Sequence, residues 1–436
     1  MAGEADTIFA VASGGSRAAV TLMRVSGAGC GAVTAALCGP LPEPRRASLR
    51  RLRDAAGEVL DQALVLWFPG PGSFTGEDCA ELHLHGGRAV VVAVAGALAA
   101  AGARPAEPGE FSRRAFLAGR LDLLQAEAIA DLVAAETEGQ RRQALRQMEG
   151  ALGGLYAGWT EELTRLLAGE EALIDFPDED LPPEVEAAAH AARTRLEDKI
   201  AAHLDDRHRG ERLREGLVFA IVGPPNAGKS TLLNALAARE VAIVSPLPGT
   251  TRDVLEVRLD LDGVPVTLLD TAGLRETPDP VEAEGVRRAR DRAASADLVI
   301  ALIDATAPGP APASSGPDAP PVLTVASKTD LASPPDGVDL AIAPPQGTGL
   351  AALRARLAAH AHEMTESAGP PALTRARHRA ALLAALEALR AAGAAPLPEL
   401  RAEELRQALR ALGRITGEVG VEEILDSVFG QFCIGK

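Results

Sequence analysis

Residues Gly223–Ser230, with the sequence GPPNAGKS, match the pattern G-x-x-x-x-G-K-[ST] of a phosphate-binding loop. Glycines at these spacings let backbone N–H groups close around phosphate oxygens. Lys229 is placed to reach the β- and γ-phosphates, and the Ser230 hydroxyl can ligate Mg²⁺. The apolar run LVFAIVG precedes the loop and a helical pattern follows it, as the motif requires. The segment therefore predicts a site for a nucleoside triphosphate.

Two further motifs follow this loop in the order expected of a nucleotide-hydrolysing switch. PGTTRD contains Thr250 and Thr251, and DTAG spans Asp270–Gly273 at the end of a predicted strand. A threonine in a movable loop and a DxxG element both become ordered on the γ-phosphate and relax after hydrolysis. Asp270 can hold Mg²⁺ through its water shell, and the Gly273 N–H can contact the γ-phosphate. Together the motifs predict a phosphate-hydrolysing switch.

Base selection depends on SKTD, Ser327–Asp330, which is the candidate for the N-K-x-D pattern of GTPases. Asp330 can accept two hydrogen bonds from the guanine edge, and the stem of Lys328 can cover the ring. Ser327 replaces the usual asparagine, so we expect one interaction that braces this loop to be lost. The later Ser-Ala element that supports guanine is also missing, because residues 343–349 read APPQGTG. The pattern favours GTP, bound less tightly than by a complete motif.

Water activation must differ from that of Ras-like switches, because Leu274 follows DTAG where those proteins carry a glutamine. Asn226, inside the phosphate-binding loop, offers a neutral amide oxygen that suits a monovalent cation. Backbone carbonyls of VSPLPGTT could complete such a cage, much as carbonyl rings coordinate K⁺ elsewhere. The alternative is that Asn226 only braces the loop.

The surrounding patterns predict how these motifs are positioned. Apolar runs alternate with Gly/Pro turns over residues 1–118, which predicts an α/β domain. Helical periodicity covers residues 119–215 and returns over residues 366–436. Between them, alternating strands and helices over residues 216–365 predict a mostly parallel sheet inserted into a split helical domain. The expected fold class is α/β plus α.

Composition narrows the function classes. The formal net charge of −16 argues against a general nucleic-acid coat protein, because phosphate neutralisation needs a basic surface. The four cysteines form no CxxC pair, so neither a disulfide framework nor a structural zinc site is expected. No run resembles a membrane span, and the acidic start MAGEADTIF is unlike a signal peptide. We expect a cytoplasmic protein with no membrane partner.

The chain resembles the MnmE (TrmE) family of tRNA-modifying GTPases over essentially its whole length. The segments that carry the resemblance are DTIFA, RVSG, FPGPGSFTGEDCAELHLHGG, PGEFSRRAFLAGRLDLLQAEAIADL, IDFPDED, GPPNAGKSTLLNAL, PGTTRD, DTAGLRETPDPVEAEG and the terminal FCIGK. The resemblance implies an N-terminal folate-binding α/β domain that dimerises, a split helical domain and an inserted GTPase domain. It also implies K⁺-stimulated, Mg²⁺-dependent hydrolysis of GTP to GDP and phosphate.

The resemblance further implies roles for individual residues of the nucleotide site. Mg²⁺ is expected on Ser230 and Thr251, and Glu282 is expected to orient water. K⁺ is expected on Asn226, Ser245, Leu247 and Thr250. The implied GTP contacts are Asn226, Ala227, Gly228, Lys229, Ser230, Thr231, Ser245, Pro246, Leu247, Pro248, Gly249, Thr250, Thr251, Asp270, Thr271, Ala272, Gly273, Lys328 and Asp330.

A second site is implied for 5-formyl- or 5,10-methylene-tetrahydrofolate, on Arg24, Glu81, Arg120 and Lys436. Arg120 stands where the family pattern leads us to expect lysine. The family implies a homodimer that works with the FAD-binding flavoprotein MnmG. Together they add a carboxymethylaminomethyl- or aminomethyl-type group to C5 of the tRNA wobble uridine. Cys433, in FCIGK, is the candidate catalytic thiol, and the alternative is that this thiol only packs.

Two alternative functions follow from single features. A ribosome-assembly GTPase shares the asparagine of the phosphate-binding loop but usually carries an added basic RNA-binding domain, which this acidic chain lacks. A lipid-anchored GTPase is suggested only by the place of Cys433, fourth from the end. Gly435 and Lys436 are poor third and last residues of a prenylation signal, so this alternative is not favoured.

Overall fold

The computed structural model describes residues 6–14, 18–175, 183–239, 256–270, 296–309, 319–366, 371–419, 422–430 and 432–435. The chain divides into two compact units. One unit is Met1–Ala130 together with Leu409–Lys436, and the other is Asp131–Ala408. Within the described residues, no helix is long and apolar enough to cross a membrane.

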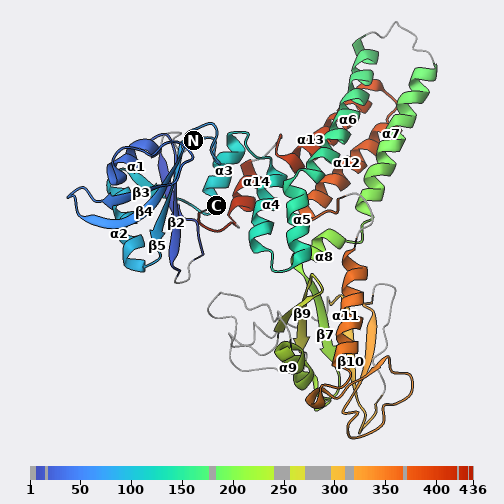
Figure 1. Cartoon of the computed structure of the whole chain (residues 1–436). Coiled ribbons are helices and arrows are strands. Elements are labelled where there is room, and N and C mark those ends of the chain that lie inside the picture. The colour runs from blue at the N-terminus through green and yellow to red at the C-terminus, as the bar shows by residue number, and fades with distance from the viewer. Residues whose placement is uncertain are drawn as a thin grey trace, which may run out of the picture. The chain divides into compact units, whose positions relative to one another are not determined.

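The first unit is built on a six-stranded sheet in the order β3-β4-β5-β2-β1-β6. Figure 1 labels β2, β3, β4 and β5 of this sheet. Neighbouring strands run antiparallel except β1 and β6, which are parallel. The strands are β1 (Thr7–Val11), β2 (Val20–Ser26), β3 (Ser48–Arg53), β4 (Val59–Phe68), β5 (Cys79–His85) and β6 (Ala103–Pro105).

One face of this sheet is covered by two helices, α1 (Cys30–Cys38) and α2 (Arg88–Ala100). Because side chains alternate along a strand, Ala63, Val65 and Trp67 of β4 all face these helices and are buried. Residues between them on β4 point to the opposite face. Part of that opposite face is covered, because Ile8 and Ala10 of β1 pack there with Phe111.

The chain leaves the sheet through α3 (Glu110–Leu117) and α4 (Leu123–Ala134), and the C-terminal helix α14 (Glu422–Phe429) belongs to the same unit. Leu123 and Ala126 of α4 pack with Phe429 of α14 and with Phe432 beyond it. This contact places the last residues of the chain within the N-terminal unit.

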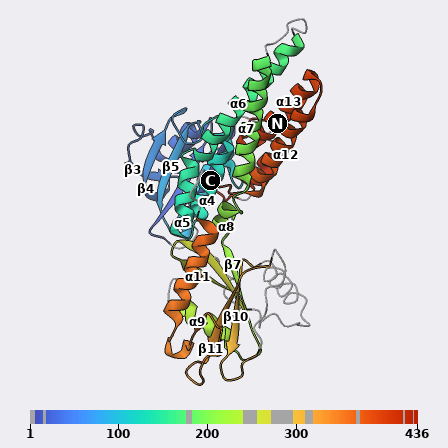
Figure 2. The same cartoon turned by 90° about the vertical axis from the view of Figure 1, so that its right-hand side faces the viewer.

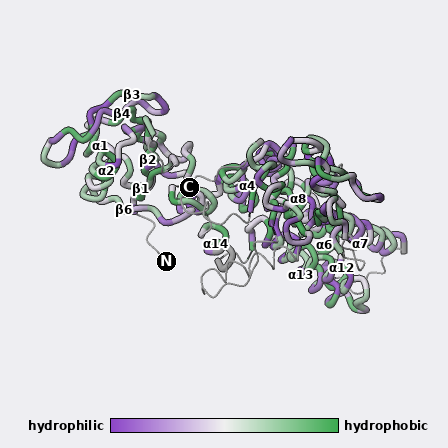
Figure 3. The backbone as a smooth tube through the Cα atoms, turned by 90° about the horizontal axis from the view of Figure 1, so that it is seen from below, coloured by the Kyte–Doolittle hydropathy of each residue, from purple (hydrophilic) through white to green (hydrophobic). Residues whose placement is uncertain are grey.

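The second unit contains a group of long helices and a second sheet. The helices are α5 (Glu138–Met148), α6 (Ala151–Asp175), α7 (Pro183–Leu204), α8 (Arg209–Glu215), α12 (Ala376–Ala394) and α13 (Pro398–Thr416). Figures 1 and 2 both show α6, α7 and α12 side by side, and α7 contacts both of the others. Hydrophobic and hydrophilic residues are mixed along these helices (Figure 3), as expected for helices with one buried face.

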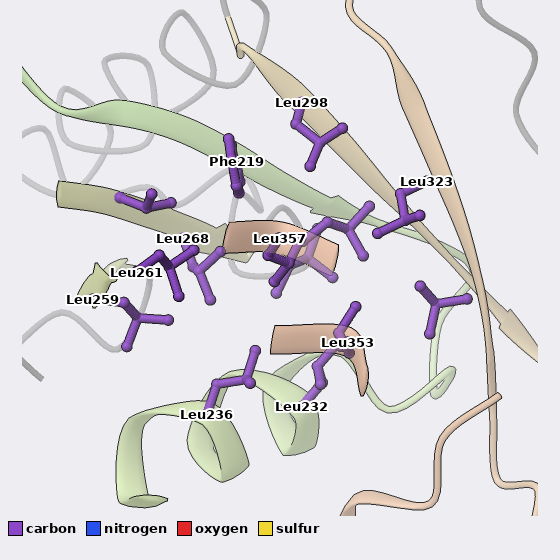
Figure 4. Close-up of a cluster of buried hydrophobic side chains, with 14 of the residues drawn as sticks. Phe219, Leu232, Leu236, Leu259, Leu261, Leu268, Leu298, Leu323, Leu353 and Leu357 are labelled. Atoms are coloured by element: carbon purple, nitrogen blue, oxygen red, sulfur yellow. The ribbon is translucent and has the colours of Figure 1, made fainter. Parts of the chain in front are cut away.

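The sheet of the second unit has the order β12-β11-β10-β7-β9-β8. Its strands are β7 (Leu217–Val222), β8 (Glu256–Leu261), β9 (Val264–Asp270), β10 (Leu298–Asp304), β11 (Val322–Ser327) and β12 (Leu340–Ala341). All neighbours are parallel except β8 and β9. Two helices, α9 (Lys229–Arg239) and α11 (Leu350–Thr365), pack against it. Leucines of both helices meet strand residues such as Phe219 and Leu268 in one apolar core (Figure 4).

A single carboxylate joins the two places where the chain enters and leaves this inserted sheet domain. Asp131 Oδ1 accepts a hydrogen bond from Arg214, which lies just before β7, at 3.0 Å. The same oxygen accepts one at 2.7 Å from Arg375, which directly precedes α12. The three side chains are 14–25% exposed. The insertion is therefore fastened to the helical part at both of its ends.

The predicted fold class is confirmed: the chain has an N-terminal α/β domain, helical segments and an α/β domain with a mostly parallel sheet. The predicted domain limits at residues 118, 215 and 365 stay a prediction.

Candidate nucleotide-binding site

The parallel strands of the second unit bring four functional segments to one edge of the sheet. The phosphate-binding loop follows β7, and Asp270, Asp304 and Ser327 are the last residues of β9, β10 and β11. In register, Ile221 of β7 is level with Asp270, and Asp304 is level with Ser327. In parallel α/β sheets, ligands bind beyond the carboxyl ends of the strands.

The phosphate-binding loop has backbone angles that its sequence makes accessible. Gly228 has a φ of 92° and Asn226 a φ of 62°, and asparagine is among the few residues that tolerate this region. Gly223 has a φ of 157°, and a Cβ added there would lie 2.5 Å from the backbone oxygen of Leu302. A side chain at position 223 would collide with β10, so glycine is required for the loop to pass this strand.

Lys229 is 5% exposed and its ammonium group donates to the backbone oxygens of Gly223 and Pro224, each at 2.8 Å. The loop therefore holds its lysine through two carbonyl groups. Phosphate oxygens placed inside the loop would compete with these two carbonyl oxygens for the N–H donors of the Lys229 ammonium group.

Ser230 donates a hydrogen bond of 2.6 Å from its hydroxyl to Asp270 Oδ2. Asp270 is 3% exposed, which places a carboxylate at the mouth of the loop. A hydroxyl and a carboxylate are oxygen ligands of the kind that Mg²⁺ prefers. The arrangement brings together two of the predicted Mg²⁺-associated side chains.

Ser327 braces the base end of the site against the phosphate end. Its buried hydroxyl lies 2.7 Å from the backbone oxygen of Ala227, inside the phosphate-binding loop, and 3.2 Å from that of Ile303. Ser327 therefore keeps a brace at this position, while the expected loss of one interaction relative to asparagine stays a prediction. A serine hydroxyl is short but reaches the loop because β11 ends directly beside it.

Lys328 is held by a carboxylate that lies outside the SKTD motif. Its ammonium group lies 2.5 Å from Asp304 Oδ2, and Asp304 also accepts hydrogen bonds from the hydroxyl and N–H of Thr306. The bond from Lys328, followed by that from the Thr306 hydroxyl, lowers the pKa of Asp304 to about 2. Asp304 is thus a fixed anion that orients the lysine.

Asp330 contacts the segment that replaces the expected Ser-Ala element. Gln346 Nε2 donates a hydrogen bond of 2.9 Å to Asp330 Oδ2, and both side chains are exposed. Gln346 ends a short 3₁₀ turn, η2 (Pro344–Gln346). The two segments predicted to face the base are therefore joined through a side-chain amide.

Of the predicted nucleotide contacts, the structure describes Asn226, Ala227, Gly228, Lys229, Ser230, Thr231, Asp270, Lys328 and Asp330. Asn226 and Thr231 are exposed on the loop and at the start of α9. Several predictions fall outside the described residues: Ser245, Pro246, Leu247, Pro248, Gly249, Thr250, Thr251, Thr271, Ala272, Gly273, Glu282 and Lys436.

Known proteins match this chain over nearly its whole length. The family description "GTP-binding protein TrmE N-terminus" matches residues 7–120, and "MnmE helical domain" matches residues 123–433. The protein named tRNA modification GTPase MnmE from Gluconacetobacter diazotrophicus is 60% identical over 435 residues, covering 98% of each chain. The chain belongs to the MnmE family.

Other MnmE proteins match equally completely. Those of Granulibacter bethesdensis and Rhodospirillum rubrum are 55% and 56% identical to this chain, covering 99% of it and 99% of each relative. The match therefore includes the N-terminal sheet, the helices and the inserted domain.

Two of the predicted folate residues of this MnmE family member, Arg24 and Glu81, lie on the sheet face opposite α1 and α2. Arg24 of β2 and Glu81 of β5 are directly paired in the sheet, and their side chains form an ion pair of 2.9 Å. The Arg24 guanidinium also lies 5.2 Å from the ring centre of Phe74 and 5.8 Å from that of Phe111. A carboxylate, a planar guanidinium and two aromatic rings therefore lie next to one another.

Arg120 reaches the same region through the loop that carries Phe74. A Cβ added at Gly76, where φ is 81°, would lie 3.3 Å from Arg120 Cγ. Glycine thus lets the arginine stem lie against this loop, although no contact between Arg120 and Arg24 is seen.

The C-terminal tail of the chain also docks on this unit. Phe432 is buried beside α14, Ile434 bridges to Pro108, and Gly435 lies against the backbone of Val11. Cys433 between them is exposed. The tail is therefore fixed on both sides of an accessible thiol.

Sequence reasoning missed Asp304, Gln346, Phe74 and Phe111 as site residues. Asp304 had a usable signal, because an aspartate that ends a buried parallel strand lies at the ligand-binding edge. The other three had none, since their contacts join segments that are separated in sequence.

Proposed function

We propose that this chain hydrolyses GTP and acts in tRNA modification. The observation that carries the proposal is the 60% identity, over 98% of both chains, to a protein named tRNA modification GTPase. An assembled phosphate-binding loop with Lys229, Ser230 and Asp270 at one sheet edge supports the hydrolase part.

In this proposal, the GTP phosphates lie inside the loop and receive its backbone N–H groups and Lys229. Ser230 and Thr251 hold Mg²⁺, and Asp270 acts through its water shell. The fit of Ser230 and Asp270 to a hard cation is supported by their 2.6 Å oxygen–oxygen contact. Bound Mg²⁺ supplies charge neutralisation on the phosphates.

Potassium is proposed at Asn226, Ser245, Leu247 and Thr250, with Glu282 orienting the attacking water. The exposed position of Asn226 on the phosphate-binding loop supports a role toward a ligand over a buried brace. We expect GTP turnover to be several-fold faster in KCl than in NaCl at equal ionic strength. Equal rates in the two salts would remove the cation from the proposal and leave the GTPase activity standing.

The modification half of the proposal uses the N-terminal unit. Arg24, Glu81, Arg120 and Lys436 bind a one-carbon tetrahydrofolate, and Cys433 takes part in the transfer. The ion pair of Arg24 with Glu81, beside the half-buried ring of Phe74, suits the hydrogen-bonding edge and flat face of a pterin. A homodimer acting with the flavoprotein MnmG would then modify C5 of the wobble uridine.

The deciding experiment is mass spectrometry of wobble nucleosides from cells that lack the gene. We expect the carboxymethylaminomethyl- or aminomethyl-type nucleosides to disappear and to return on complementation with the wild-type gene. Complementation with Cys433→Ser should leave GTPase activity intact but not restore the nucleosides. Unchanged nucleosides in the deletion strain would instead favour a ribosome-assembly GTPase, which the same cells would show as altered ribosomal subunit profiles.

A further inference from the structure

The loop of residues 343–348 has no backbone donor left for a nucleotide base. Pro344 and Pro345 lack an N–H group. The N–H groups of Gln346 and Thr348 both bond to the Ala343 oxygen, at 3.1 and 3.2 Å. The N–H of Gly347 bonds to Pro344 O, and that of Ala343 bonds to Thr348 O, each at 3.0 Å. All four N–H groups of this loop are therefore used within it.

Residues 343–348 can therefore donate a hydrogen bond to a base only through side chains. Of its members, Gln346 is the one whose side chain reaches the base-reading motif, through the 2.9 Å bond from Nε2 to Asp330 Oδ2. An amide NH₂ group carries two N–H donors, so this bond uses one and leaves one.

Guanine presents two donors, N1–H and the 2-amino group, next to an acceptor, the C6 carbonyl. A carboxylate that accepts both donors leaves the carbonyl beside the oxygen that takes N1–H. A side-chain amide already bonded to that carboxylate is close to the C6 carbonyl and can donate to it. Gln346 is bonded to Asp330 in this way. If Asp330 accepts the two guanine donors, the free N–H of Gln346 is therefore close to the C6 carbonyl.

We infer that Gln346 is a specificity-determining residue, which positions the Asp330 carboxylate and supplies the donor for the C6 carbonyl of guanine. The inference rests on the proposed function, because it assumes that the site binds a guanine nucleotide. It also explains how the chain tolerates two prolines in this loop: the side-chain amide replaces a backbone N–H.

The test compares the affinities of four nucleoside diphosphates for the full-length chain and its variants. GDP has all three groups, IDP lacks the 2-amino group, 6-thio-GDP has a weaker acceptor at C6, and ADP is the reference. The wild type should bind GDP best and ADP worst. If the wild type does not prefer GDP to ADP, the proposed function fails, and the role of Gln346 falls with it.

In Gln346→Ala we expect GDP affinity to fall about tenfold, the size of one or two lost hydrogen bonds. The ratios of GDP to IDP affinity and of GDP to 6-thio-GDP affinity should both shrink. In the variant Asp330 is less well positioned for the 2-amino group, and the donor to the C6 carbonyl is missing. KM for GTP should rise with kcat unchanged. A purely structural role of Gln346 would weaken all four nucleotides equally and leave these ratios as they are.

Two further variants keep the test decisive. Gln346→Glu keeps the shape but places a second carboxylate beside Asp330, so it should weaken GDP more than Gln346→Ala does. Thr348→Ala changes an exposed side chain of the same loop and should match the wild type. Wild-type affinities and ratios in both Gln346 variants would overturn the inference while leaving GTP binding in place.

Discussion

The two ends of the candidate nucleotide site follow their sequence motifs to different degrees. At the phosphate end the motif is complete, and its glycines and Lys229 adopt the geometry that the pattern predicts. At the base end two motif elements are replaced, and yet Ser327 and Gln346 supply contacts of their own. A phosphate site built from backbone N–H groups depends on glycine at fixed positions. A base site built from side chains can be assembled from several different residues.

The largest expected effect tests the phosphate end. Lys229→Ala should lower kcat for GTP hydrolysis by about 10²–10³-fold, because a preorganised cation toward the phosphates is lost. Steady-state phosphate release measures this. Lys199→Ala removes an exposed lysine that pairs with Glu162 on the helices and should keep the wild-type rate. A loss of similar size in Lys199→Ala would mean that the assay reports stability.

The next effect tests base recognition. Asp330→Asn should weaken GDP binding by about 10–100-fold and strengthen binding of xanthosine diphosphate, because an amide N–H then meets a carbonyl in place of the 2-amino group. Calorimetric titration with both nucleotides checks the exchange. Asp336→Asn, at an exposed position of the same loop region, serves as the control. If Asp330→Asn keeps its preference for GDP, the base is read elsewhere.

A smaller effect is expected where the base end of the nucleotide site contacts its phosphate end. Ser327→Ala removes the buried hydroxyl that contacts the oxygens of Ala227 and Ile303, which should cost about 1–3 kcal/mol of folding free energy. The thermal midpoint of the variant, with and without GDP, measures this loss. Ser333→Ala, on an exposed serine, should have no effect. An unchanged midpoint in Ser327→Ala would show that the brace is dispensable.

The smallest effect is a pH dependence at Asp304. Its pKa is about 2 in the folded protein, below the ordinary 3.8, because Lys328 and Thr306 stabilise the charged form. A lowered pKa stabilises the fold above pH 3.8, and this contribution disappears as pH falls toward 2. The difference in unfolding free energy between wild type and Asp304→Asn should therefore narrow between pH 4 and pH 2. A constant difference would mean that Asp304 does not titrate in this range.

Most of the fold and the phosphate end of the site could be predicted from the sequence. Alternating strand and helix patterns predicted the parallel sheet, and GPPNAGKS and Asp270 lie at its carboxyl edge as expected. The sequence did not predict the contact of Ser327 with the phosphate-binding loop. It also left out Asp304, whose role depends on the register between β10 and β11.

The sequence by itself determined the features that local chemistry controls. These are the periodicity of strands and helices, the glycines that permit unusual φ angles, and the lysine and serine at fixed spacing. Only the tertiary structure decided the pairs Ser327–Ala227, Lys328–Asp304 and Asp330–Gln346. Their partners are separated by 100, 24 and 16 residues, and hydrogen bonds act over about 3 Å. No spacing rule specifies such contacts, because the folding of the intervening chain sets the distance between the partners.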